Sequence, residues 1–149
     1  METINNDKAF ENLRSITGNR LEIIRDPFFT YFTVSPDELL PLMQTIKEQL
    51  GMNYLSNLTA VDYGEEFEII YHLYAIPDNQ QKIAVKTRVP RDQAKLSSVF
   101  SVYPTADWQE REVFDLMGIQ FSQHPNLVRV LLPDDFEGHP LRKDFKKEG

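Results

Sequence analysis

Apolar and polar residues follow two different spacings along the first 118 residues, which indicates that helices and strands are both present. Apolar positions three or four residues apart predict helices at 7–17, 35–51 and 106–117. Runs rich in β-branched and aromatic residues predict strands at 20–25, 28–34, 54–63, 66–76 and 81–89. The order α-β-β-α-β-β-β-α predicts an α+β fold, in which helices pack on a mainly antiparallel mixed sheet.

The segment 35–51 has the clearest helix signals. Ser35 is placed to accept hydrogen bonds from first-turn amides, Pro36 takes the first helical position, and Glu38 completes a capping box. Gly51 follows the last apolar position and is expected to end the helix. One apolar stripe predicts the face that packs on the sheet, and it consists of Leu39, Leu42, Met43, Ile46 and Leu50.

A helical wheel at about 100° per residue separates two faces of the helix at 106–117. The apolar face consists of Val113, Phe114, Leu116 and Met117. The opposite face is mostly charged and consists of Trp108, Arg111, Glu112 and Asp115. Gly118 follows directly and is expected to end this helix.

Glu110 falls inside the apolar face of that helix, where a carboxylate needs a partner or a proton. One interpretation makes Asp107 the N-cap and Glu110 the reciprocal member of a capping box. The alternative is an arginine that arrives from a distant part of the chain, with Arg129 and Arg142 as candidates. Thr105 is an equally good N-cap and would place Glu110 deeper in the helix, so both interpretations stay open.

The composition excludes several classes of function. The 16 basic and 23 acidic residues give a net charge of -7, and no nucleic-acid partner is expected, because phosphate binding depends on Lys and Arg. The absence of cysteine excludes disulfides, zinc–thiolate sites and ordinary cysteine-ligated iron–sulfur clusters. Neither a secretion signal nor an apolar run of the ~20 residues that span a bilayer is visible, so neither is expected.

Residues 119–149 differ from the preceding 118, and the sequence divides into an α+β core domain (1–118) and an extended C-terminal arm (119–149). Prolines at 125, 133 and 140 prevent long helices there. The segment nevertheless carries many large apolar residues, and its five basic and five acidic residues balance. Apolar anchors between charges are typical of protein interfaces, which favours a docking arm. The arm could also wrap its own core, and both arrangements could hold for different parts.

An enzymatic interpretation is weaker. The residues that could form a metal site or an acid–base set are His124, Asp134, Asp135, His139 and Asp144. Their spacing matches no metal-binding motif, and no Ser or Cys stands in the context of a nucleophile. We therefore expect no catalytic, cofactor-binding or metal-binding residues in this chain, although the sequence leaves open whether the isolated chain has an activity.

One stretch carries a family resemblance. "EREVFDLMGIQFSQHPNLVRVLLPDDFEGHPLRKDF" (110–145) closely resembles the signature of the 30-kDa subunit family of respiratory complex I, the C subunit of NADH-quinone oxidoreductase. The resemblance implies a cofactor-free structural subunit of the peripheral arm, which docks on the large 49-kDa-type subunit beside a cluster-bearing subunit. NADH or another donor, iron–sulfur clusters and quinone then belong to the complex, which couples electron transfer to ion translocation.

The resemblance also implies a location and a set of docking residues. The chain is expected at the cytoplasmic face of the cell membrane, with membrane contact only through the complex. The residues expected to dock are Glu110, Arg111, Glu112, Asp115, His124, Arg129, Asp134, His139, Arg142, Lys143 and Asp144.

A second assignment stays open within the same resemblance. Many family members continue well beyond the KDF segment, whereas this sequence stops at Gly149. Short forms recur as the equivalent small subunit of membrane-bound nickel–iron hydrogenases and of formate hydrogenlyase. The sequence does not choose between NADH, ferredoxin and hydrogenase as the source of electrons.

Overall fold

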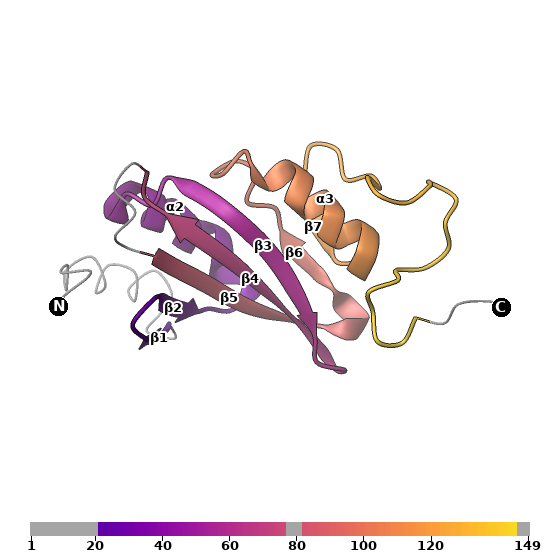
Figure 1. Cartoon of the computed structure of the whole chain (residues 1–149), viewed down its shortest axis with the longest axis horizontal. Coiled ribbons are helices and arrows are strands. Elements are labelled where there is room, and N and C mark those ends of the chain that lie inside the picture. The colour runs from indigo at the N-terminus through magenta and orange to yellow at the C-terminus, as the bar shows by residue number, and fades with distance from the viewer. Residues whose placement is uncertain (1–20, 77–81, 146–149) are drawn as a thin grey trace.

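Five strands form the main sheet of the computed structural model, which describes residues 21–76 and 82–145. The predicted helix at 7–17 lies outside the described residues. The sheet has the order β1-β2-β5-β4-β3 (Figure 1). Its strands are β1 (Glu22–Arg25), β2 (Thr30–Thr33), β3 (Tyr54–Asp62), β4 (Glu66–Tyr74) and β5 (Lys82–Pro90).

The pairing of these strands confirms the predicted mixed sheet. β1 and β2 form an antiparallel hairpin, and β3, β4 and β5 form an antiparallel meander. The exception is β2, which runs parallel to β5 with Thr30 opposite Ile83. A parallel pair needs a crossover connection, which here includes α2 (Leu39–Leu50).

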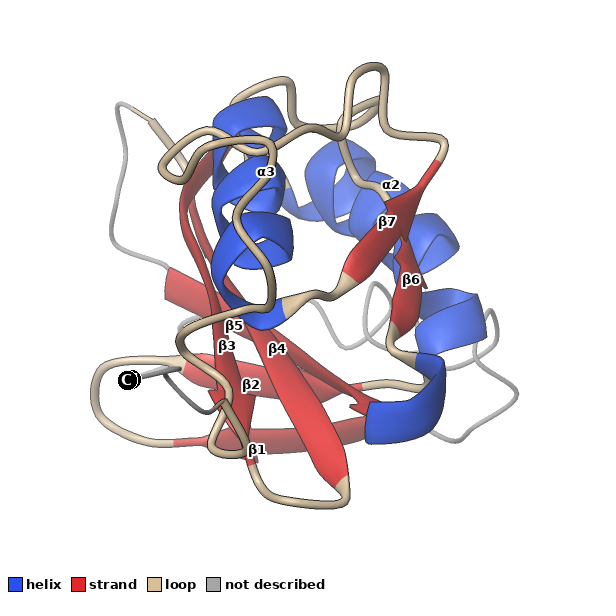
Figure 2. Cartoon of the chain, turned by 90° about the vertical axis from the view of Figure 1, so that its right-hand side faces the viewer, coloured by secondary structure: helices blue, strands red, loops and turns tan. Residues whose placement is uncertain are grey.

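One face of the sheet packs against helices. Figure 2 shows α2 and α3 (Ala106–Met117) on the same side of the strands. Alternate residues of β4, from Phe67 to Leu73, are buried in the same core cluster as the apolar stripe of α2, as the strand and helix periodicities require. The predicted α+β class is therefore confirmed, and α3 has the predicted bounds.

The first turn before α2 differs from the prediction. A 3₁₀ turn, η1 (Pro36–Glu38), precedes the helix, and the Glu38 amide donates to the main-chain carbonyl of Ser35 at 3.0 Å. In the described part of the chain, the buried Ser35 hydroxyl has no hydrogen-bond partner. The predicted capping box is wrong, because the tighter turn lets the backbone carbonyl take the amide that the side chain would have received.

Two short strands were not predicted. A 3₁₀ turn, η2 (Arg91–Gln93), leads from β5 into β6 (Lys95–Ser97), and β7 (Gln120–Ser122) follows α3. The two strands pair in parallel, with Leu96 opposite Phe121. Regular structure therefore resumes two residues after Gly118, where the sequence predicted none. Strands of three residues are too short for alternation to reveal.

Candidate docking site

The C-terminal arm folds back along α3 after β7. Figure 1 shows this segment in orange to yellow, leaving β7, passing the helix and returning to the helix C-terminus. Short turns shape it, in which Phe136 donates to the Pro133 carbonyl and Arg142 to the His139 carbonyl. The arm is thus held by its own chain, and the contacts that hold it lie at both ends of α3.

Asp115 is the principal anchor of the arm and is fully buried. Its Oδ1 accepts a hydrogen bond from Arg129 Nη1 at 2.7 Å. Its Oδ2 accepts three main-chain amides, from Val130 at 3.1 Å, Leu131 at 2.7 Å and Leu132 at 3.0 Å. Burial by itself raises the pKa of Asp115, but these amides and the guanidinium outweigh it and hold the pKa below its ordinary value.

The arm also satisfies the end of α3. A helix leaves its last four carbonyls without partners inside the helix. Gly118 N closes the last helical bond, to Phe114 O at 2.8 Å, and the three carbonyls that follow accept hydrogen bonds from the arm. Two of the arm donors are arginines, which complement the negative end of the helix dipole. The donors are Arg129 Nη1 and His139 Nδ1 to Asp115 O (3.1 and 3.0 Å), Leu141 N to Leu116 O (2.9 Å) and Arg142 Nε to Met117 O (2.6 Å).

Gly118 makes this close approach possible. Its φ of +75° is the left-handed conformation that glycine adopts without strain. A Cβ on this residue would lie 2.6 Å from His139 Cδ2 and 3.0 Å from Arg142 Nη2. The glycine predicted to end the helix therefore does so, and it also leaves room for the arm.

Asp62, at the end of β3, forms a second anchor. Its Oδ2 accepts the Lys143 amide at 2.8 Å, and its Oδ1 accepts the Gly64 amide at 2.8 Å and forms an ion pair with Arg91. Arg91 also pairs with Asp144 of the arm at 2.8 Å. Burial raises the pKa of Asp62, but Arg91 and the two amides outweigh it and leave the pKa well below its usual range.

Glu110 is fully buried at the other end of α3, and both sequence interpretations of it are wrong. The Ser98 hydroxyl donates to its Oε1 at 2.6 Å, and the Val99 amide donates to its Oε2 at 2.8 Å. Thr105, not Asp107, is the N-cap, and neither proposed arginine reaches the carboxyl group. Burial raises the pKa of Glu110 to about 7. Neutral donors from the loop before α3 have therefore replaced the expected charge partner.

His124 lies beside the buried carboxyl group of Glu110. Its side chain is fully buried, with Nε2 3.9 Å from Glu110 Oε1. Nδ1 accepts the Asn126 amide at 2.9 Å, so in the neutral ring the proton is on Nε2, which donates to the Asp107 carbonyl at 3.1 Å. The imidazole thus ties the start of the arm to the first turn of α3.

The residues expected to dock fall into two groups. Most of them face inward or along the arm and make contacts within the chain. These are Glu110, Asp115, His124, Arg129, His139, Arg142 and Arg111, the last of which donates to Val128 O at 3.3 Å. The exposed ones are Glu112, Asp134, Lys143 and Asp144, of which Asp144 also pairs with Arg91 and Lys143 bonds to Asp62 through its main-chain amide. Their role toward a partner stays a prediction.

Sequence reasoning missed three residues of this site. Ser98 lies in a loop without any motif, and Arg91 lies on a 3₁₀ turn at the end of β5. Asp62 precedes "YG" in a predicted turn, and an aspartate two residues before glycine is a signal for a side-chain-to-backbone turn of the kind seen here.

The residues of the enzymatic interpretation are not gathered into one site. His124 contacts the first turn of α3, whereas His139 contacts its last turn, and eight residues of helix between Asp107 and Asp115 correspond to ~12 Å. Over 21–76 and 82–145, no three His, Cys, Asp or Glu side chains are grouped as a metal site would require. None of the helices in these ranges is long and apolar enough to cross a membrane.

Apolar side chains remain exposed on α3 and the arm. Leu131 is 53% and Leu141 60% exposed, and Trp108 of α3 is half exposed beneath the Arg111 guanidinium. Exposed apolar side chains rimmed by charges are typical of interfaces. Together, the fold and this surface define a small α+β protein whose arm is seated on its own helix and presents apolar groups outward.

Comparison with known proteins gives the family. The family described as the 30 Kd subunit of respiratory-chain NADH dehydrogenase matches residues 32–149. The chain belongs to this family, and thus to the subunits of a multi-subunit respiratory complex. The C subunit of NADH-quinone oxidoreductase from Moorella thermoacetica is 50% identical over 115 residues, covering 76% of this chain and 77% of the relative. Its counterpart from Citrifermentans bemidjiense is 42% identical over 120 residues, covering 78% of this chain and 74% of the relative.

Solved structures agree with this assignment. The trypsin-resistant fragment (1–134) of Nqo5 superposes with a TM-score of 0.70 at 25% identity, covering 83% of this chain and all of the fragment. A chain of the membrane-bound sulfane sulfur reductase, an archaeal respiratory membrane complex, gives a TM-score of 0.74 at 30% identity, covering 93% of this chain and 86% of that one.

Proposed function

We propose that this chain is a structural subunit of the peripheral arm of a complex I-type oxidoreductase and that it docks through its C-terminal arm. The observation that carries the proposal is the seated arm itself. Asp115 and Asp62 fix its backbone, so its outward side chains are ordered before a partner arrives. Preordered surfaces bind at a lower entropic cost than disordered ones.

The partner we propose is the large, 49-kDa-type subunit, beside a neighbouring cluster-bearing subunit. The present sequence has no cysteine, so the ordinary ligands of iron–sulfur clusters must come from those partners. NADH or another donor, the clusters and quinone then belong to the complex, whose electron transfer to quinone is coupled to ion translocation. The chain supports this process at the cytoplasmic face of the membrane, which it meets only through other subunits.

A related complex is the second candidate. The likeness to a chain of the sulfane sulfur reductase extends over 93% of this sequence, so a similar small chain belongs to an archaeal respiratory membrane complex. By that analogy, this chain would be the equivalent subunit of a membrane-bound nickel–iron hydrogenase or a formate hydrogenlyase. Its docking residues would be the same, and only the neighbouring donor subunits would differ.

Replacement of one exposed arm residue tests the docking role. Leu141→Asp places a charge on a side chain that is 60% exposed, so stability should change by less than about 0.5 kcal/mol. Because the charge would be buried on docking, we expect the tagged variant to lose co-purification with its partners from native membranes. Mass spectrometry of the wild-type pull-down identifies those partners and thereby the donor.

Two further variants complete this experiment. Phe28→Asp changes a 73% exposed residue between β1 and β2 and should leave co-purification intact. Figure 1 shows these two strands at the opposite end of the protein from the arm. Arg142→Glu removes the donor to Met117 O and should abolish co-purification while the sheet still folds. Recovery of the Leu141→Asp variant with its partners at the wild-type level would contradict docking through the arm.

A further inference from the structure

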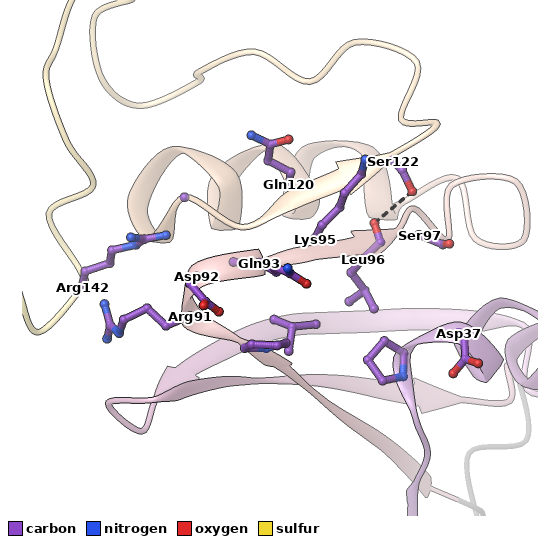
Figure 3. A pocket seen from close by; sticks show the side chains of 15 residues that line it. Asp37, Arg91, Asp92, Gln93, Lys95, Leu96, Ser97, Gln120, Ser122 and Arg142 are labelled. Carbon is purple, nitrogen blue, oxygen red and sulfur yellow. Dashed lines mark hydrogen bonds between the residues drawn. The ribbon is translucent and has the colours of Figure 1, made fainter.

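A groove of about 720 Å³ lies beside β6, on the core side of the arm. Figure 3 shows β6 and β7 along one side of it and the ends of β5 and η1 along the other. Arg142 of the arm borders one end, so the groove is continuous with the proposed docking surface. Its other lining residues include Lys95, Ser97, Gln120 and Ser122, which the β6–β7 register places on one face of this small sheet.

The hydrogen bonds of β6 use only one of its edges. Gln120 N–H donates to Ala94 O at 2.9 Å, and Ser98 N–H donates to Ser122 O at 2.9 Å. In a parallel ladder the bonding groups alternate, so the amides and carbonyls of Lys95 and Ser97 point to the opposite edge. Among the described residues, β6 has no partner strand on that edge.

Two three-residue parallel strands make an unusually small sheet, since parallel pairs gain stability from further strands. Within residues 21–76 and 82–145, no main-chain group bonds to the amides and carbonyls of Lys95 and Ser97, so these four groups can pair with an added strand. An edge of this kind binds an extended chain by adding a strand to the sheet. The geometry therefore selects an extended polypeptide over a compact small molecule.

The charges in the groove define the polypeptide further. Lys95 and Arg142 form no ion pair with a carboxylate in the described part of the chain, and Arg91 is already paired with Asp62 and Asp144. Asp37 lies at the opposite end of the groove from Arg142, and Asp92 also lines the groove, beside Arg91, as Figure 3 shows. A complementary segment therefore carries an acidic side chain near Lys95 and a basic or neutral one near Asp37 and Asp92.

We propose that the free edge of β6 binds an extended segment of a partner subunit as a third strand, with an acidic residue of that segment facing Lys95. This inference rests on the proposed function, because it assumes that the chain enters a complex. The chain would then contact its partners at two places. The arm contacts them through exposed apolar side chains, and β6 contacts them through main-chain pairing.

Hydrogen exchange on the purified complex and on the isolated full chain tests the proposal. The amides of Lys95 and Ser97 should exchange at least about tenfold more slowly in the complex. The Ser98 amide, already bonded to Ser122 O, should be protected in both samples and serves as the internal control. If the chain co-purifies with its partners but Lys95 and Ser97 exchange equally fast in both samples, the strand proposal is overturned while the docking function stands.

A proline substitution supplies an independent measurement. Ser97→Pro removes an outward amide at a strand edge where proline is tolerated, and Ser97→Ala keeps that amide. We expect Ser97→Pro to weaken retention in the complex about tenfold and Ser97→Ala to have no effect. A photo-crosslinker at Lys95 should capture a partner segment with an acidic residue; capture of residues 1–20 of the same chain, or of a second copy, would refute the assignment.

Discussion

Glu110 and Asp115 are both fully buried acids on α3, yet their surroundings shift their pKa values in opposite directions. Asp115 receives three amides and a guanidinium, so its charged form is stabilised despite burial. Glu110 receives one hydroxyl and one amide and has the Asp107 carboxylate nearby, so burial dominates and its neutral form is favoured. The number of donors and their charge, not the depth of burial, decides the ionisation state of each acid.

Replacing Glu110 by Gln should make stability less dependent on pH. The pKa of Glu110 rises from 4.5 to about 7 on folding, so the folded state binds more protons between these values and its stability falls as the pH rises. The shift corresponds to on the order of 3 kcal/mol at pH 8. Because a glutamine amide can bond both Ser98 Oγ and the Val99 amide, thermal unfolding should show Glu110→Gln more stable than wild type at pH 8 and similar at pH 5.

A matched variant on the same helix controls this measurement. Glu112 is exposed, so Glu112→Gln should leave the pH profile of unfolding as it is in the wild type. A Glu110→Gln profile with the wild-type slope between pH 5 and 8 would show that the buried carboxyl does not titrate in this range.

At the level of elements, α2 and α3 end in the same way but in different surroundings. Both are followed by a glycine in the left-handed conformation, Gly51 at φ +69° and Gly118 at φ +75°. A Cβ at Gly51 would meet no atom within 4 Å, whereas one at Gly118 would collide with His139. The end of α3 is therefore both a backbone turn and a seat for the arm.

Alanine at the two glycines separates these roles. Gly51→Ala should cost about 1–2 kcal/mol, which is the strain of the left-handed conformation alone. Gly118→Ala adds the displacement of His139 and should cost about 2–4 kcal/mol. Urea unfolding gives both values, and equal losses would mean that the His139 contact contributes nothing to stability.

At the level of the whole molecule, two carboxylates hold the arm to different layers. Asp115 connects it to α3, and Asp62 connects it to the end of β3 and, through Arg91, to η2. Both acids have lowered pKa values, so their contributions are present above the ordinary carboxyl pKa and are lost as the pH falls through the folded values. Acid should therefore release the arm.

Asp115→Asn should have the same effect at neutral pH. The asparagine side chain leaves Arg129 without a carboxylate partner and weakens the hydrogen bonds from three main-chain amides. The free energy of unfolding should fall by about 3–5 kcal/mol, by comparison with other buried pairs. Hydrogen exchange should speed up at Leu131 and Leu132 while the strands β3–β5 stay protected. Asp134→Asn, an exposed control, should change neither region. Unchanged protection at Leu131 in Asp115→Asn would indicate that Asp62 alone holds the arm.

Much of this fold could be predicted because its signals are local. The bounds of α3 follow from periodicity and from Gly118, and the meander follows from alternation and turns. The burial of Asp115 could not be predicted, because a wheel describes one helix and not the residues, 14 to 17 positions later, that cover it. For the same reason the wheel identified Glu110 as inward-facing but could not identify Ser98 as its partner.

The hydrogen bonds that the arm donates to the last carbonyls of α3 have a consequence for biosynthesis. Their donors in the arm, from Arg129 to Arg142, follow the helix in the chain and leave the ribosome after it. At ~5–20 residues per second, a nascent chain needs roughly one to five seconds to complete the set. During that interval the last turn of α3 lacks these donors and its carbonyls are hydrated, so a stalled or truncated polypeptide would display a recognisable defect to chaperones and proteases.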